Sequence, residues 1–254
     1  MTGSRRTLSV AAACATLLLL MLWGLRGLPA YGHYPGPYGD LINRVAPPER
    51  KLPNTISAVN FDYRGADTLG EEFILFAAVA GITMLLRNER ARATRLPLAP
   101  APGRLAGSRT EALRAFSIAG AGLTIAFGIY LGIHPHLTPG GGFQGAAILA
   151  GFTALTFLGL GYETFERVVR REQHEIVEAI GAGAYAVIGL ATLVVSGAFL
   201  ANVLPLGREG QLFAAGTIPV INFFVALEVF AGFTLMFLEF ARETRQQEPE
   251  ARGR

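Results

Sequence analysis

One carboxylic acid, Glu228, stands in the apolar segment Ile218–Phe237 near the end of the chain. A charged carboxylate in the middle of a bilayer is costly, so such a group faces a partner or a water-filled cavity, or stays protonated. Glu228 is therefore a predicted proton relay. The alternative is a neutral acid that hydrogen-bonds a helix of another subunit and fixes their register. Asn222, six residues earlier, either hydrogen-bonds across helices as a packing residue or helps to open the helix entry.

A dense group of charges lies at the start of another apolar segment. Its members, within residues 61–73, are Asp62, Arg64, Asp67, Glu71 and Glu72. Thr68 and Glu71 have the spacing of a capping box, in which hydroxyl and carboxylate cover N–H groups at a helix start. That role leaves Asp62, Asp67 and Glu72 unexplained, and they can form an ion-pair network or a cation entry site. With Glu228, the four acids of this group are the candidate residues of an ion path.

A third feature is the sequence Thr-Pro-Gly-Gly-Gly-Phe-Gln-Gly at residues 138–145, between two apolar segments. Pro135 and Pro139 interrupt any helix that continues from the first segment, and the glycines allow a tight turn into the second. Backbone amides in such a turn can bind an anion, but without a Gly-Lys-Ser/Thr ending a nucleotide P-loop is excluded. We expect close approach of another polypeptide here, with Phe143 as an anchoring side chain.

Histidine and cysteine do not add a metal or redox site to these features. His134 and His136 can titrate near neutrality, but no further clear ligands accompany them. The single cysteine, Cys14, allows neither an intrachain disulfide nor a multi-thiolate site. No nucleophile, base and orienting acid can be combined from the sequence, so we expect neither a cofactor nor enzymatic catalysis.

The elements that position these residues are predicted to be transmembrane helices. Apolar residues make up 51% of the 254 positions and charged residues 16%, and the mean hydropathy is +0.39. The apolar residues form runs of about 20, the length that crosses a bilayer as a helix. We predict an all-α, polytopic membrane protein with about six spans: Leu8–Leu25, Thr68–Leu86, Ala115–Ile133, Phe143–Gly161, Ala179–Ala201 and Thr217–Phe240.

The arginines predict the orientation of these spans. They gather near both termini and in residues 87–114 and 167–171, so the positive-inside rule places both termini in the cytoplasm and residues 138–145 outside. This topology explains the net charge of +3 without a nucleic-acid partner. Ser4-Arg5-Arg6 before the first span is also compatible with a secretory or twin-arginine signal, although we expect this helix to be retained.

The connections are expected to be simple. Leu96–Gly103 is rich in Pro and Ala and predicts a semi-extended cytoplasmic linker. Tyr31–Asn54 contains five prolines and predicts an irregular outer loop. Tyr162–Glu178, which includes His174, has oppositely charged side chains four residues apart and predicts solvated helical extensions.

Two of these motifs resemble parts of one protein family. Pro139, Gly140, Gly141, Gly142, Phe143 and Gly145, preceded by His136, resemble the signature of the MnhB domain. That domain is the B subunit of Mrp-type multisubunit sodium/proton antiporters, and has relatives in membrane-bound hydrogenases. The segment Asp62–Glu71 is similar to one in the C-terminal tail of the antiporter A subunit, or in the hydrogenase E subunit. One departure is Ala146, where many relatives have another glycine.

The resemblance implies a non-enzymatic subunit of a Na⁺/H⁺ antiporter in the cell (inner or plasma) membrane. Its implied partners are the large A and D subunits, which are like those of complex I, and the small C, E, F and G subunits. A membrane-arm subunit of a redox-driven, hydrogenase-like complex and a purely structural scaffold are the alternatives. The implied divisions are an anchor (1–30), an outer loop (31–60), an A-tail-like segment (61–95), the linker (96–111), an MnhB-like four-helix domain (112–242) and a tail (243–254).

Overall fold

The computed structural model describes residues 3–28, 31–33, 36–93 and 110–246 of the chain, and every regular element within them is a helix. The predicted linker Leu96–Gly103 and residues 247–254 lie outside the described residues. The elements are α1 (Gly3–Leu25), α2 (Pro37–Arg50), α3 (Thr55–Ala58), the π-helical turn η1 (Val59–Tyr63), α4 (Gly65–Ala93), α5 (Glu111–Ile133), α6 (Gly142–Leu160), α7 (Tyr162–Val168), α8 (Arg171–Ser196) and α9 (Ile218–Gln246).

Six of these helices are long and apolar enough to cross a membrane, which confirms the predicted all-α polytopic class. They are α1, α4, α5, α6, α8 and α9. The fifth span differs from the prediction because α8 begins at Arg171, eight residues before Ala179, the predicted start. The predicted solvated connection is therefore divided between α7 and the first two turns of α8.

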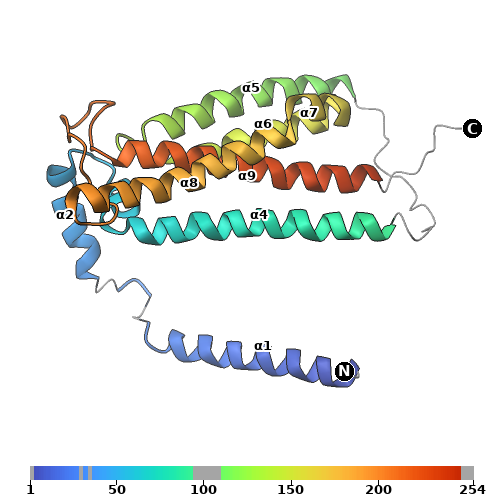
Figure 1. Ribbon diagram of the computed structural model, residues 1–254, viewed down its shortest axis with the longest axis horizontal. Helices are drawn as coiled ribbons and strands as arrows, with labels where there is room; N and C mark the ends of the chain where they lie inside the picture. Colours follow the sequence, from blue (N-terminus) through green and yellow to red (C-terminus); the bar gives the residue numbers. More distant parts are fainter. Residues whose placement is uncertain (1–2, 29–30, 34–35, 94–109, 247–254) are drawn as a thin grey trace, which may run out of the picture. The chain divides into compact units, whose positions relative to one another are not determined.

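The chain divides into two compact units, residues 1–41 and 42–254. In the first, α1 leaves its apolar side chains exposed; Leu19, for example, is 67% exposed. In the second, α4, α5, α6, α8 and α9 run along one another (Figure 1), and α9 packs against all four of the others. Half of the most apolar stretch of α9 is buried, against 11% in α4 and in α5. α9 is therefore the core helix of this unit.

Two predictions are wrong, and both concern the end of the bundle where α2 and α3 lie. The segment Tyr31–Asn54 is not irregular, because α2 occupies most of it and contains three of its prolines, Pro37 at its first position and Pro47 and Pro48 in its interior. Ile42 and Ala46 lie one turn apart and are buried in the main core with Leu52. This apolar face supplies the stabilisation that the local proline content does not indicate.

The predicted capping box is also wrong. α4 begins at Gly65, three residues before Thr68, directly after the π-helical turn. Thr68 is already inside the helix and is buried. The hydroxyl of Tyr185 on α8 donates to the carbonyl of Gly65 at 2.8 Å, so a tertiary contact ties down the start of the helix.

The glycine-rich segment packs against helices of its own chain, and the approach of another polypeptide stays a prediction. A Cβ at Gly145 would lie 2.6 Å from the carbonyl oxygen of Gly128 and 2.7 Å from the nitrogen of Gly132 on α5. Phe143 meets Phe233 of α9 edge to face, with ring centroids 5.8 Å apart. The missing side chains thus let α6 lie directly on the backbone of α5.

Candidate functional site: a row of buried carboxylates

Glu228 lies in the middle of α9 and is completely buried. Neither of its carboxylate oxygens has a hydrogen-bond partner among the described residues. Gly181 of α8 brings the backbones of the two helices together at this point, because a Cβ at Gly181 would lie 2.6 Å from the Glu228 nitrogen. The predicted isolated acid is therefore inside the protein and not on a lipid-facing surface.

Two further buried acids approach Glu228 from neighbouring helices. Glu72 on α4 is 1% exposed and Glu178 on α8 is 6% exposed. Each has one buried carboxylate oxygen without a hydrogen-bond partner in the described part of the chain. Glu72 and Glu178 both interact electrostatically with Glu228. A charge on one of these interacting buried carboxyl groups disfavours a charge on the next, unless protons or cations lie between them.

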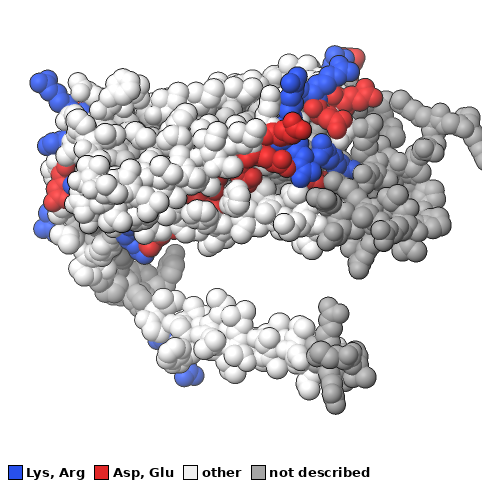
Figure 2. Space-filling model, in the orientation of Figure 1, with Lys and Arg blue, Asp and Glu red and all other residues white. Residues whose placement is uncertain are grey.

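The row continues to a fourth buried acid, Glu239, which differs from the others because it is ion-paired. Its Oε1 lies 3.3 Å from Nη1 of Arg171 on α8 and 3.6 Å from Nη1 of Arg242. Arg171 also contacts Glu175 at 2.6 Å. Figure 2 shows acidic side chains in a diagonal row across one face of the bundle that ends among basic side chains. Arg171 and Arg242 thus lie at one end of the row.

The remaining predicted acids are not part of this buried row, although Glu71 interacts electrostatically with Glu72. Asp62 accepts from Nδ2 of Asn202 at 3.0 Å and forms an ion pair with Arg50 at 2.5 Å. Asp67 forms an exposed ion pair with Arg64, and Glu71 is exposed. The structure brings Glu72 and Glu228 together, whereas Asp67 and Glu71 are exposed near the start of α4 and Asp62 lies in η1 with its side chain 8% exposed. Their role in an ion path stays a prediction.

The ion pair of Asp62 is part of a small polar network. The guanidinium of Arg50 lies over the ring of Tyr63, 5.0 Å from its centroid. The Tyr63 hydroxyl donates to Glu49 at 2.7 Å. Burial, followed by the hydrogen bond to Glu49, raises the pKa of Tyr63 to about 12. This phenol therefore stays protonated and acts as a donor that holds α2 against η1.

Sequence reasoning missed Glu178 and Glu239. The sequence places Glu178 in the predicted solvated connection, because oppositely charged side chains lie four residues apart there. The signal that identifies it is a stripe of small or polar residues at helical spacing, which the structure buries along α8: Glu178, Gly181, Ala182, Tyr185, Gly189 and Thr192. Glu239 gave no comparable signal, because it lies beside Arg242 near the predicted end of a span.

Asn222 ties the glycine-rich segment to α9. Its Oδ1 accepts from the backbone N–H of Gly142 at 2.5 Å, and its Nδ2 donates to the carbonyl of Gly132 at 3.0 Å. Both groups lie at helix ends, where the backbone lacks intrahelical partners. Of the two predicted roles, the structure supports hydrogen bonding across helices.

The two histidines have different surroundings. His136 is fully buried, and its Nε2 lies 3.2 Å from the carbonyl oxygen of Gln211. Burial lowers the pKa of His136, which keeps the imidazole neutral. His134 contacts the Thr138 hydroxyl at 3.3 Å and stacks edge-on against Tyr130. Among the described residues no three acidic, histidine or cysteine side chains are grouped so that they could hold a metal ion.

Comparison with known proteins places the chain in a family. A domain related to the MnhB subunit of the Na⁺/H⁺ antiporter matches residues 112–235. An uncharacterized protein of Methanocaldococcus jannaschii is 31% identical over 210 residues, which cover 75% of this chain and 78% of that protein. The chain contains a domain of the MnhB family. The MnhB match covers α5 to most of α9, and therefore includes the glycine-rich segment, Glu178 and Glu228.

Two solved structures share the fold of this MnhB-family chain. A chain of the membrane-bound sulfane sulfur reductase, an archaeal respiratory membrane complex, is 26% identical with a TM-score of 0.67. The similarity covers 92% of this chain and 98% of that chain. A chain of the Mrp complex from Dietzia sp. DQ12-45-1b is 24% identical with a TM-score of 0.69, over 95% of this chain and 26% of that chain. The chain is thus a multi-pass membrane protein of a kind found in multisubunit complexes.

Proposed function

We propose that the chain is a subunit of a monovalent cation/proton antiporter in the cell membrane, where it contributes to the ion path and to assembly. Its partners are the large A and D subunits, which resemble those of complex I, and the small C, E, F and G subunits; its ions are Na⁺ and H⁺. Family membership supports this proposal. In this arrangement residues 61–95 correspond to the A-subunit tail and residues 112–242 to the MnhB domain.

The observation that carries the ion-path role is the convergence of Glu72, Glu228 and Glu178 from three helices. Each is buried and each has at least one oxygen without a hydrogen-bond partner in the described residues. A buried carboxylate without a partner is destabilising, so its presence indicates a function beyond packing. Protons or small cations that move along the row neutralise these groups in turn. The arginine-paired Glu239 marks one end of that path.

The test is antiport in everted membrane vesicles with Glu228→Gln in the complete complex. Glutamine keeps the shape of the side chain but cannot release a proton or carry a charge. We expect the complex to assemble and cation-dependent proton efflux to fall at least tenfold. Glu172→Gln, an exposed position on α8, is the matched control and should transport normally. Normal transport by assembled Glu228→Gln would remove this residue from the path.

Two other functions are distinguished by related measurements. Similarity to a chain of the sulfane sulfur reductase complex favours, as the second candidate, a membrane arm driven by electron transfer. That candidate predicts that the purified complex contains Cys-rich subunits with iron, which an antiporter lacks. A pure scaffold predicts that deletion of residues 140–142 separates the subunits, while Glu228→Gln leaves transport intact.

A further inference from the structure

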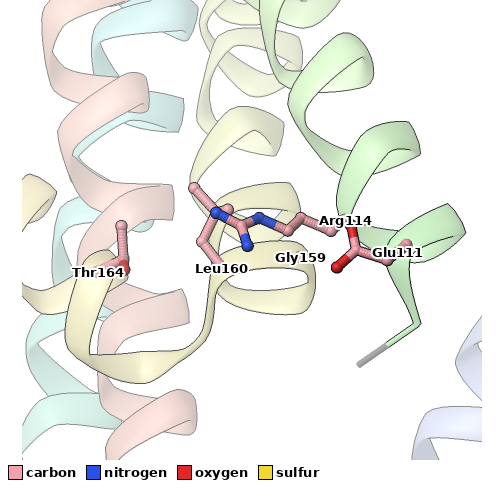
Figure 3. A pocket seen from close by; sticks show the side chains of 5 residues that line it. All are labelled: Glu111, Arg114, Gly159, Leu160 and Thr164. Carbon is pink, nitrogen blue, oxygen red and sulfur yellow. The ribbon is translucent and has the colours of Figure 1, made fainter. Parts of the chain in front are cut away.

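A polar pocket opens between the start of α5 and the end of α6, away from the buried carboxylates. Its cavity has a volume of about 380 Å³ and is lined by Glu111, Arg114, Gly159, Leu160 and Thr164. Figure 3 shows the Arg114 side chain extending from α5 across the space towards Leu160, with Glu111 one turn earlier on the same helix. None of these residues belongs to the proposed ion path.

The pocket lies where two candidate membrane spans end. Glu111 is the first residue of the span Glu111–Ile133, and Leu160 is the last residue of the span Gly142–Leu160. Both ends lie on the same side of the membrane, because α5 and α6 are consecutive antiparallel spans. Charged side chains at such a boundary face the polar layer between hydrocarbon and water.

Two opposite charges line the pocket. Neither Arg114 nor Glu111 forms an ion pair with another side chain in the part of the chain that the structure describes. They are also not paired with each other, although they are three residues apart and lie on neighbouring positions of the helix surface. The pocket therefore presents guanidinium donors and a carboxylate acceptor side by side, with the Thr164 hydroxyl on its far wall.

The surface next to the pocket is apolar and exposed. Ile118 of α5, one turn after Arg114 on the same face of the helix, is 53% exposed. Gly159 sits directly on Ser117, because any Cβ at this glycine would overlap the Ser117 side chain. This close contact of α5 and α6 forms the floor of the pocket. A ligand with a zwitterionic head and acyl chains fits both the pocket and its surroundings.

We propose that this pocket binds the headgroup of a phospholipid that carries a phosphate and a primary ammonium, as in phosphatidylethanolamine. The phosphate accepts hydrogen bonds from the Arg114 guanidinium, and the ammonium donates to the Glu111 carboxylate. The acyl chains lie against Ile118. The bound lipid holds the start of α5 against the turn that joins α6 and α7.

The test uses the purified, delipidated complex, titrated with dioctanoyl phosphatidylethanolamine and monitored by native mass spectrometry. We expect a saturable site that Arg114→Gln weakens on the order of tenfold, because a charge-assisted contact to the phosphate is lost. Arg170→Gln, an exposed arginine on the same side of the bundle, is the matched control and should leave binding unchanged.

Headgroup preference gives the second measurement. Dioctanoyl phosphatidylcholine has no N–H to donate, so it should bind several-fold more weakly than phosphatidylethanolamine. Glu111→Gln should abolish this preference. Three outcomes would overturn the proposal. The first is equal binding of the two lipids to the unmodified complex, and the second is an equal loss of binding in Arg114→Gln and Arg170→Gln. The third is displacement of the lipid by millimolar inorganic phosphate, which would identify a simple anion site.

Discussion

Gly181 of α8 lies against the backbone of Glu228 of α9 so closely that a Cβ at position 181 would stand 2.6 Å from the Glu228 nitrogen and 2.7 Å from its Cβ. The two helices therefore touch at the residue whose carboxyl group is central to the buried row. Any side chain at position 181 must separate them, and the position of the Glu228 carboxylate changes with that separation.

Gly181→Ala is accordingly expected to destabilise the bundle by about 1–3 kcal/mol, the usual range for overpacking of a close contact. The measurement is the thermal unfolding midpoint of the purified complex, together with its transport rate. Gly183→Ala on the same helix is the control, because a Cβ there meets nothing within 4 Å. Equal midpoints for the two variants would show that α8 and α9 are not in contact at Gly181.

Glu178→Gln tests the acid that sequence reasoning missed. If Glu178 continues the row from Glu228, its neutral replacement should slow cation-dependent proton movement at least tenfold in an assembled complex. Proton flux in reconstituted vesicles is the measurement. Glu172→Gln on the same helix again serves as the exposed reference. A Glu178→Gln complex with full flux would restrict the path to α4 and α9.

Arg171 and Glu239 are expected to be energetically coupled. Arg171→Gln removes one cation from the buried Glu239, while its ion pair with Arg242 at 3.6 Å remains, so the loss should stay below the roughly 3–5 kcal/mol of a buried charge with no partner. Glu239→Gln in the Arg171→Gln background should restore part of the lost stability, because the buried charge is then gone. A double-mutant cycle on thermal stability measures the coupling. Simple additivity of the two substitutions would contradict a direct ion pair.

His136 predicts a pH dependence of stability. Burial lowers its pKa in the folded protein, with His134 as a nearby like charge. As the pH falls below the unfolded value of about 6.5, the unfolded chain binds a proton that the folded chain does not, so stability is lost. His136→Gln removes this contribution and should flatten the decline between pH 7 and 5.

The measurement is the unfolding midpoint of the complex across that pH range. His33→Gln changes an exposed histidine and should follow the unmodified protein. A decline that is equally steep with and without His136 would assign the pH dependence to other groups.

The sequence alone determined the class of protein and the position of its spans, except for the start of α8. Runs of about 20 apolar residues cannot lie stably in water, and a helix is the structure that satisfies their backbone within lipid. Glu228 was identifiable for the same reason, because an acid in such a run contrasts with all its neighbours. The two motifs of the family resemblance were likewise visible as residue types at fixed spacing.

The tertiary structure decided which polar residues act together. Glu178 and Glu72 join Glu228 only because α4, α8 and α9 meet side by side, with Gly181 allowing the contact between the last two. Asp62, although it stands in the same charge-dense segment as Glu72, is held by Arg50 and Asn202. Local sequence records the chemistry of each side chain, whereas its partners come from segments up to 140 residues away, which only packing brings together.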